Sequence, residues 1–460
     1  MNKTKKNRKG GKVIASGGYG CVFDPALKCE GTLKREANKI SKLMTNKHAT
    51  QEYEEINDIK SKLDSIPNYE DYFLVNGATL CKPAKLTFND LHEFDGKCTA
   101  LPKDNITKKN INKKLDEVMT LNLPNGGLPV DDYLYDKGTY QKMYNVHIKL
   151  VKLLKNGIIP MNEKNIYHSD IKDSNVLIDD NLKTEIKARL IDWGLTVEYD
   201  RGSKETFPKN WRNRPLQFNV PFSVIIFSDS FYEKYSKYLE EGGKIDKEKL
   251  YPFVLDFLNS WMKERGAGHY KFINQIMLIL YDSSLESVSE KDKPTVIETE
   301  ITIPTIVNYI CDVLEHYTKF RGDGSLNLRE YLDDVYTKIV DIWGFLNVYY
   351  PILEMLSNNY TRLKTDEMKI FKQLQFIYST YMYEPRHEPI HMNELLNDLK
   401  ILGNLIHIVI HGKRKTTSSN NSALAKGIKT KKNQTFKSPV FKRKPLVKRF
   451  KNPFLLSLKK

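Results

Sequence analysis

The sequence predicts an α+β protein, in which a β-rich first part is followed by a helical second part. Short apolar runs separated by glycine turns occur in the first part, and apolar residues at helical spacing recur in the second. With 460 residues the chain is long enough for two or three domains, or for one large domain with insertions and tails. We expect two lobes with a cleft between them.

The β-rich part is expected to span residues 12–125, after a basic leader at 1–11 that is predicted to be disordered. "KVIASGGYGCVFDPAL" has a strand, a glycine turn and a second strand, and "NKISKLM" is consistent with a third strand. Residues 48–66 are predicted to form a helix, because their apolar positions recur at helical spacing. A polar insertion is expected around residues 102–117.

The helical part is expected to span residues 126–412, with a large helical insertion at 223–335. It begins with a helical pattern at 131–159, and two short strands, "NVLID" and "KARLIDWGL", follow. Further helical patterns occur at 250–281, 304–317, 329–357, 366–382 and 391–409.

The net charge of +16 is concentrated in a tail, residues 413–460, which is predicted to be disordered. The tail carries sixteen Lys and Arg and no acidic residue, so the rest of the chain has 57 of each sign. We expect a polyanionic partner for the tail: nucleic acid, the nuclear-import machinery or an anionic membrane. A solvated, self-repelling tail is the simpler alternative. Phenylalanines interleave with the basic residues and favour surface anchoring: Phe436, Phe441, Phe450 and Phe454.

The cysteines predict neither a zinc site nor a disulfide framework, because their number is odd and no CxxC pair occurs. They are Cys21, Cys29, Cys81, Cys98 and Cys311. We therefore expect a reduced, intracellular chain. No apolar run reaches 18 residues, so no transmembrane helix is expected, and the basic start lacks the apolar stretch of a signal peptide.

A dense polar cluster, "NIYHSDIKDSN" at 165–175, is the sharpest motif of the sequence. It fits H-x-D-x-K-x-x-N, whose last three specified residues are Asp170, Lys172 and Asn175. An aspartate can accept the proton of an attacking hydroxyl, a lysine can neutralise a moving phosphoryl group, and an asparagine oxygen can bind a metal ion. The alternative is a solvated turn.

A glycine loop, "ASGGYGCV", precedes this cluster and suits the binding of a triphosphate by backbone N–H groups. Its candidate nucleotide-binding residues are Ile14, Ala15, Ser16, Gly17, Gly18, Tyr19, Gly20, Cys21 and Val22. Lys42, on the expected third strand, can reach the phosphates if Glu52 or Glu55 on the next helix holds it. The alternatives are a plain hairpin turn and a solvated lysine.

Asp192 in "LIDWGL" is a candidate ligand of Mg²⁺, because it follows an apolar strand and precedes a glycine. Alone it is equally well explained as a turn aspartate. Its position behind the other motifs favours the metal site.

The ordered set of these motifs resembles the eukaryotic-type Ser/Thr protein kinase family. "GGYGCVFDPAL", "YHSDIKDSNVLI" and "NVPFS" are most similar to divergent kinases of giant DNA viruses (mimivirus-like). The resemblance implies a bilobal kinase-like fold with a β-rich N-lobe and a helical C-lobe, the cofactors ATP and Mg²⁺, a protein substrate, and a viral protein in the host cytoplasm. It also implies a hinge at 121–134, an aspartate, Asp341, that braces the catalytic loop, and a late arginine, Arg386.

The sequence departs from the family at several positions. Ala15 replaces the first glycine, Ser169 replaces the arginine that reads activation-loop phosphorylation, and Trp193 replaces a phenylalanine. "NVPFS" stands where Ala-Pro-Glu is usual, which leaves Arg386 without its customary partner. These departures put peptide docking in doubt more than nucleotide binding.

Three functions are compatible with the motifs. The first is a Ser/Thr protein kinase, which Lys172 favours because tyrosine-specific members usually carry alanine there. The second is a small-molecule kinase, which Lys172 disfavours. The third is a weak kinase or pseudokinase that serves as a nucleotide-binding scaffold. The sequence does not disclose the substrate, the activator, the oligomeric state or the purpose of the insertion.

Overall fold

The computed structural model describes residues 11–135, 138–180, 185–201, 207–322, 324, 326–384 and 387–412. The chain divides into two compact units, residues 1–410 and 411–460. The predictions for the basic leader, for Arg386 and for the basic tail fall outside the described residues, apart from Gly11 at the end of the leader.

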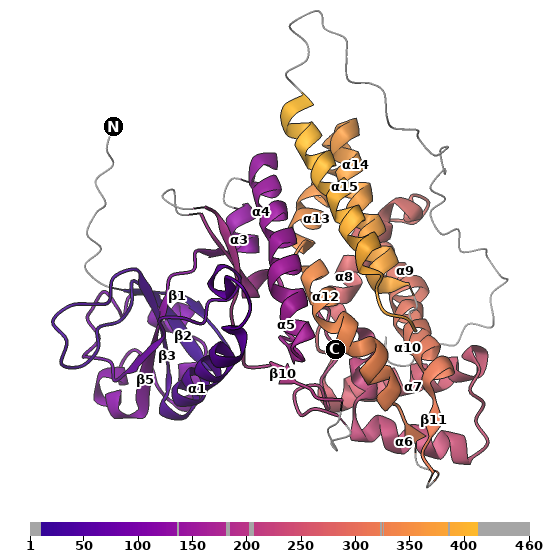
Figure 1. Cartoon of the computed structure of the whole chain (residues 1–460), viewed down its shortest axis with the longest axis horizontal. Coiled ribbons are helices and arrows are strands. Elements are labelled where there is room, and N and C mark those ends of the chain that lie inside the picture. The colour runs from indigo at the N-terminus through magenta and orange to yellow at the C-terminus, as the bar shows by residue number, and fades with distance from the viewer. Residues whose placement is uncertain are drawn as a thin grey trace, which may run out of the picture. The chain divides into compact units, whose positions relative to one another are not determined.

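The first part of the chain forms an antiparallel sheet with the strand order β1-β2-β3-β5-β4 (Figure 1). The strands are β1 (Lys12–Ser16), β2 (Gly20–Asp24), β3 (Lys39–Thr45), β4 (Thr79–Cys81) and β5 (Val118–Pro124). The three strands expected from the sequence are therefore confirmed, and the mixture of sheet and helix agrees with the predicted α+β class.

Helix α1 (Asn46–Leu63) follows β3 directly and confirms the helix expected at 48–66. Its buried residues Ala49, Ile56, Ile59 and Leu63 recur at helical spacing, so they lie on one face. That face packs against β3 and β5, which fixes the helix beside the sheet.

The polar insertion is longer than expected, spans residues 94–117, and forms short helical turns that pack against β1 and β2 of the glycine hairpin. They are α2 (Phe94–Lys97), η2 (Leu101–Asp104), η3 (Ile111–Lys113) and η4 (Leu115–Glu117). Phe94, Leu101 and Ile111 pack with Val13 and Phe23 of the sheet in a separate hydrophobic cluster. The insertion is polar in sequence but contributes apolar residues to the core of this part.

Two disulfide bonds correct the expectation of a fully reduced chain. Cys21 pairs with Cys98, and Cys29 pairs with Cys81, with Cα–Cα distances of 5.3 and 5.8 Å. The partners are 77 and 52 residues apart, so no local spacing of the sequence indicates them. Tertiary packing brings the partners together, and Cys311 is a buried thiol.

The helical part begins after a short connection from β5. It starts with α3 (Val130–Tyr135), α4 (Tyr140–Leu153), the π-helical segment η5 (Leu154–Ile158) and α5 (Ile159–Glu163), which confirms the helical pattern at 131–159 with one break between α3 and α4. Small antiparallel ladders follow: β7 (Ile166–Tyr167) with β10 (Val197–Glu198), and β6 (Leu128–Pro129) with β8 (Val176–Asp179) and β9 (Lys187–Leu190). The two strands expected here, β8 and β9, are confirmed.

The remaining chain is mostly helical, as the sequence predicts. Its helices are α6 (Asp229–Glu240), α7 (Lys247–Arg265), α8 (Tyr270–Tyr281), α9 (Lys293–Ile297), α10 (Ile303–Tyr317), α11 (Arg329–Tyr331), α12 (Thr337–Asn347), α13 (Tyr350–Ser357), α14 (Thr365–Tyr378) and α15 (Met392–His411). A small hairpin of β11 (Lys319–Phe320) and β12 (Leu326–Asn327) lies within the predicted insertion. The 3-10 helix η7 (Phe222–Ile226) precedes them, and the π-helical segments η10 (Leu332–Tyr336) and η12 (Ser379–Tyr383) follow α11 and α14 directly.

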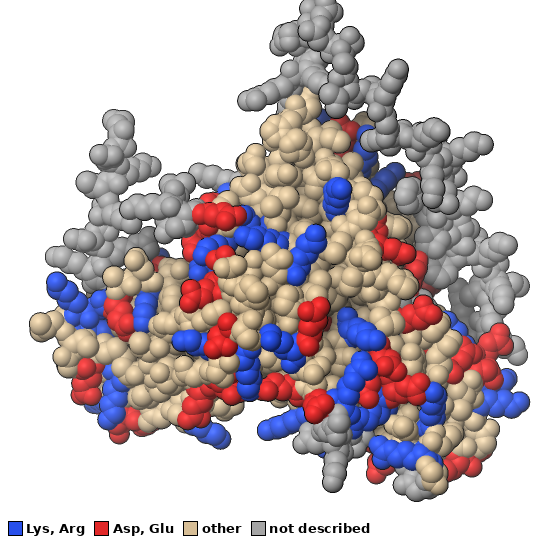
Figure 2. Space-filling model, in the orientation of Figure 1, with Lys and Arg blue, Asp and Glu red and all other residues tan. Residues whose placement is uncertain are grey.

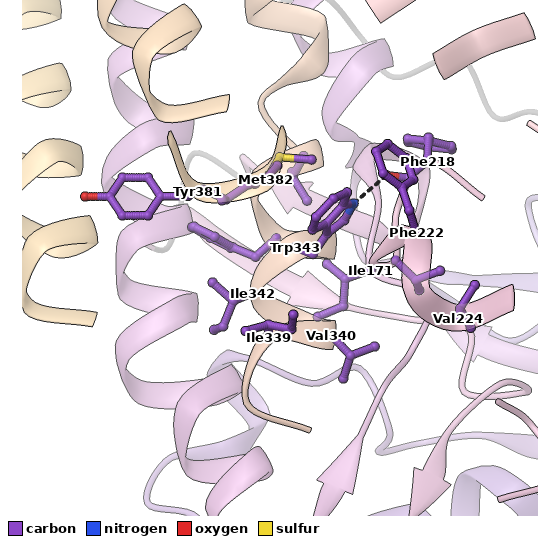
Figure 3. Packing of buried hydrophobic residues seen from close by; sticks show 14 of the residues in the cluster. Ile171, Phe218, Phe222, Val224, Ile339, Val340, Ile342, Trp343, Tyr381 and Met382 are labelled. Carbon is purple, nitrogen blue, oxygen red and sulfur yellow. Dashed lines mark hydrogen bonds between the residues drawn. The ribbon is translucent and has the colours of Figure 1, made fainter. Parts of the chain in front are cut away.

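Helix α12 is buried at every residue except Lys338 and lies in the helical core. Figure 3 shows Trp343 of this helix among Ile171, Phe222 and Met382, and its indole Nε1 donates to the carbonyl of Phe218 at 2.8 Å. Ile171 belongs to the polar cluster of the sequence, so this cluster is anchored in the hydrophobic core through the Ile171 side chain.

Charged side chains of both signs are interspersed on the face shown in Figure 2. Among the described residues no single helix is long and apolar enough to cross a membrane. Arg329–Asn347 and Tyr350–Ser357, which are bent by 40°, pass that test of length and composition only as a pair.

Candidate functional site

The polar cluster forms a loop between β7 and β8 that fixes the Asp170 carboxylate from several directions. Oδ2 of Asp170 accepts hydrogen bonds from Lys172 Nζ at 2.7 Å and from Asn175 Nδ2 at 2.9 Å. Oδ1 accepts from Asn219 Nδ2 at 2.8 Å. Burial by itself raises the pKa of Asp170, but the charge of Lys172 and the hydrogen bonds from Lys172 and Asn219 outweigh it and hold the pKa below its ordinary value. Asp170 is therefore an ionised carboxylate at neutral pH.

Asp341 of α12 holds the start of this loop, as the resemblance implies. Its two carboxylate oxygens accept from the backbone N–H groups of His168 and Ser169, each at 2.8 Å. Asp341 is fully buried, and this burial raises the pKa of its carboxyl although the two backbone hydrogen bonds oppose the shift. The contact fixes the backbone just before Asp170 and is the reason that Ser169 can adopt a left-handed φ of 61°.

The segment after residue 207 makes a second set of contacts with this loop. Trp211 Nε1 donates to the Ser169 hydroxyl at 2.8 Å, and Arg214 Nη1 donates to the Ser169 carbonyl at 2.8 Å. Trp211 is fully buried, and Arg214 is 6% exposed. Ser169 therefore contacts this segment directly, through a neutral side chain and its backbone.

Asp192 lies beside the loop because the strands β8 and β9 pair with each other. His168 Nε2 donates to the Ile191 carbonyl at 2.9 Å, and the imidazole lies 4.8 Å from the Trp193 ring. Ile191 N also donates to the Asn175 carbonyl at 3.1 Å. Asp192 has a left-handed φ of 67°, which costs about 1–2 kcal/mol for a residue with a Cβ. Such local strain is typical of functional sites.

Lys42 forms an ion pair with Glu52 of α1, with a distance of 2.5 Å between Nζ and Oε2. Glu55, the other candidate, accepts instead from Gln51 Nε2 at 2.8 Å. Burial raises the pKa of Glu52, the Lys42 ammonium opposes this shift, and the negative charges of Asp192 and Glu55 add to it. The charge of Asp192 therefore acts on Glu52 of this pair.

The glycine loop is a tight hairpin beside Lys42. Gly17 N donates to the Gly20 carbonyl at 2.8 Å, and Val22 is the register partner of Lys42. A Cβ on Gly20 would lie 2.3 Å from the Met44 side chain, whereas a Cβ on Gly18 would meet open space. Only glycine therefore fits at residue 20 of this hairpin.

The other residues of the hairpin differ in exposure. Ile14 and Tyr19 are 44% and 63% exposed, and Tyr19 stacks on His48 at 4.3 Å. Ser16 accepts hydrogen bonds at its hydroxyl from the backbone N–H groups of Thr99 and Ala100. Together with the Cys21–Cys98 disulfide, these bonds attach the hairpin to the polar insertion.

The structure thus brings Asp170, Lys172 and Asn175 together in one loop. Contacts of Ile191 and Trp193, the neighbours of Asp192, connect the chain at Asp192 to that loop. Lys42 and Glu52 approach the same region. Sequence reasoning did not single out three further residues of the site: Trp211, Arg214 and Asn219. Asn219 begins the "NVPFS" stretch, which the family resemblance had marked, but no local pattern indicated its partner.

No known family model matches the chain. A stretch of 88 residues is 36% identical to the lectin-domain containing receptor kinase VI.3 of Arabidopsis thaliana. The match covers 18% of this chain and 12% of the plant protein. This similarity indicates relatedness to a kinase over a short part of the chain.

Proposed function

We propose that this protein is a serine/threonine protein kinase that transfers the γ-phosphate of ATP to Ser or Thr hydroxyls of proteins. The observation that carries the proposal is the Asp170 carboxylate, which Lys172, Asn175 and Asn219 hold in place and whose pKa Lys172 and Asn219 lower. The partial similarity to a plant receptor kinase supports it. A bilobal kinase fold is part of the proposal, with the sheet of β1 to β5 as the N-lobe.

In the proposed reaction the substrate hydroxyl attacks the γ-phosphorus, and Asp170 accepts its proton. A bond forms between the hydroxyl oxygen and phosphorus, the bond between the γ-phosphorus and the β,γ-bridging oxygen breaks, and ADP leaves. Lys172 neutralises charge on the moving group. Lys42, held by Glu52, contacts the nucleotide phosphates under the glycine hairpin. Catalysis then rests on positioning and on charge neutralisation.

The oxygen donors of the site fit a magnesium ion. Both observed hydrogen bonds of the Asn175 side chain use Nδ2, so its Oδ1 remains as a ligand, and the Asp192 carboxylate offers further oxygens. Asn175 and Asp192 would hold the ion, which neutralises nucleotide phosphate charge when bound. The negative charges of Glu52, Glu55 and Asp192 crowd this region, and a cation would relieve that repulsion.

The test is transfer of labelled phosphate from ATP to generic basic and acidic protein substrates, followed by identification of the phosphorylated amino acid. We expect phosphoserine or phosphothreonine from the wild type. Asp170→Asn should lower the rate by about 10²–10⁴-fold while nucleotide binding persists. Asp58→Asn, at an exposed residue of α1, is the matched control and should retain the rate. Transfer by Asp170→Asn at the wild-type rate would refute the proposal and favour a scaffold.

Location and tail partners remain predictions from the sequence. An intracellular site of action, a viral origin, and binding of nucleic acid or anionic membrane by residues 413–460 are parts of the same proposal. Removal of residues 413–460 should weaken binding to DNA or to anionic liposomes in a salt-dependent way. Unchanged binding after truncation would exclude the tail as the contact.

A further inference from the structure

Two histidines and an aspartate meet where α10 approaches the chain between η12 and α15. Among the residues that the structure describes, Asp312, His316 and His387 offer one ligand atom each, and these atoms all lie within 4.8 Å of one another. Asp312 and His316 are four residues apart on α10, so they share one face of the helix. His387 comes from a segment 75 residues away from Asp312. No motif of the sequence indicated this group.

The hydrogen bonds of the group define which nitrogen atoms carry protons. Nδ1 of His316 lies 2.8 Å from the backbone carbonyl of Asp312, and Nδ1 of His387 lies 3.0 Å from Asp312 Oδ2. A carbonyl and an ionised carboxylate only accept hydrogen bonds, so both Nδ1 atoms donate. In neutral His316, Nε2 then keeps a free lone pair that can bind a metal ion.

The two imidazole rings stack face to face, with centroids 3.5 Å apart and an angle of 3° between the planes. Neutral imidazole is the form that binds metal ions. The side chains of Asp312 and His387 are 13% and 37% exposed. The group is therefore open enough for an ion to enter, and one carboxylate is largely shielded from water.

We propose that Asp312, His316 and His387 form a binding site for a divalent transition-metal ion of the zinc type. The ion would lie between Asp312 Oδ2 and His387 Nδ1, the Nδ1 proton of His387 would move to Nε2 of the same ring, and His316 would contribute Nε2. Zinc binds nitrogen and oxygen at about 2.0–2.2 Å, which puts two ligand atoms of a tetrahedral site about 3.3–3.6 Å apart. The observed 3.0 Å between Oδ2 and Nδ1 is close to that separation.

The identity of the donors separates this ion from magnesium. Imidazole nitrogen suits zinc, copper and nickel, whereas magnesium prefers oxygen. The site is thus chemically distinct from the proposed nucleotide site, where Asn175 and Asp192 offer oxygen only. This inference does not depend on the proposed kinase activity.

The proposed ion joins two segments that are distant in sequence. α10 belongs to the predicted insertion, and His387 lies just before the final helix α15. The Tyr317 hydroxyl also donates to the His387 carbonyl at 2.9 Å, so His387 already has a second contact with the end of α10. Bound metal would stabilise this contact between the insertion and the end of the helical part.

Binding is tested with the full chain after treatment with a chelator. Zn²⁺ affinity is measured by competition with a coloured chelator, and Co²⁺ is added in parallel for its visible absorption spectrum. We expect one equivalent of Zn²⁺ and a Co²⁺ spectrum typical of nitrogen and oxygen ligands. His316→Ala and His387→Ala should each weaken Zn²⁺ binding by about 10-fold or more. Zn²⁺ should also raise the unfolding temperature of the wild type but not of these variants.

Two control variants separate this site from others. His391→Ala removes an exposed histidine four residues after His387 and should leave Zn²⁺ affinity unchanged. Asp192→Asn changes a ligand of the proposed magnesium site and should also leave the Zn²⁺ affinity unchanged. Wild-type Zn²⁺ affinity in the double variant His316→Ala/His387→Ala would overturn the inference. So would an equal loss in His391→Ala or Asp192→Asn.

Discussion

Asn219 donates a hydrogen bond from Nδ2 to Oδ1 of Asp170 at 2.8 Å, across 49 residues of sequence. Lys172 and Asn175 occupy the other carboxylate oxygen, so both oxygens of Asp170 have fixed partners. Asn219 is fully buried, and its contact therefore does not depend on a mobile surface side chain. In the proposed kinase, Asn219 acts as a positioning residue for the group that accepts the proton.

The first prediction is that Asn219→Ala lowers kcat of the proposed phosphoryl transfer. Loss of a hydrogen bond to a charged group costs about 1.5–3 kcal/mol, which corresponds to a fall of about 10–100-fold. KM for ATP should change little, because Asn219 contacts Asp170 and not the nucleotide-binding hairpin. Steady-state kinetics with varied ATP measure both constants.

A pH profile distinguishes this positioning role from general destabilisation. The hydrogen bond from Asn219 is one of the interactions that keep the pKa of Asp170 low. Its removal should move the acid limb of the kcat/KM profile to higher pH, because Asp170 then protonates more readily. An unchanged profile together with a lowered unfolding temperature would indicate a structural role alone.

The second prediction concerns the partner of Lys42. Glu52→Gln should weaken nucleotide binding or transfer by about 10-fold or more, because it removes the charge that holds the Lys42 ammonium at 2.5 Å. Glu55→Gln is the matched variant one helical turn away, and we expect a change below about 3-fold, within the range of a surface interaction. Fluorescent ATP titration and transfer assays of both variants check this. Equal losses in the two variants would contradict the assignment of Glu52.

The third prediction compares two glycines of one hairpin. Gly20→Ala places a Cβ 2.3 Å from the Met44 side chain and 2.8 Å from the Leu43 carbonyl, so β2 must move away from β3. The expected cost is about 1–3 kcal/mol, with a comparable loss of nucleotide affinity. Gly18→Ala meets open space and should retain stability within about 0.5 kcal/mol. Denaturant unfolding and ATP titration measure the difference, and equal behaviour of the two variants would contradict it.

The sequence could predict those parts of the site whose residues lie close together in the chain. Asp170, Lys172 and Asn175 share one loop, and their spacing in the sequence was enough to mark them as candidate site residues. The helix α1 and the strand β3 could also be predicted from the sequence, because apolar periodicity and glycine turns are local signals. The choice between Glu52 and Glu55 could not be predicted, because the two lie three residues apart in the middle of the same helix, and only the packing of α1 on the sheet selects between them.

Contacts over long sequence separation had no comparable signal. Trp211 and Arg214 reach Ser169 across 42 and 45 residues, and neither belongs to a motif with a fixed spacing. The prediction that the cysteines form no disulfide framework was wrong for the same reason. The number of cysteines and the absence of CxxC say nothing about residues distant in sequence, whereas tertiary packing of the insertion brings Cys98 to Cys21.

The fourth prediction is a loss of stability in mild acid caused by His147. This residue of α4 is 2% exposed, and its Nδ1 lies 3.0 Å from the Tyr349 hydroxyl. Burial lowers the pKa of His147 from 6.5 to about 4, although a hydrogen bond with the backbone of Leu399 opposes the shift. Between these two pH values the unfolded chain binds more protons at this residue than the native protein does.

The free energy of unfolding should therefore fall as the pH decreases from 6.5 to 4, by about 3 kcal/mol from this residue. Denaturant titrations at several pH values measure the slope. His147→Gln should be less stable at pH 7 because it disturbs the packing, but its stability should fall less steeply with acid, since glutamine does not titrate. His92→Gln, at a histidine with a side chain 65% exposed, is the control and should keep the wild-type slope. The variant His147→Gln lacks the titrating group of His147 and keeps all others. If its stability fell with acid as steeply as that of the wild type, other groups would be the cause of the acid sensitivity.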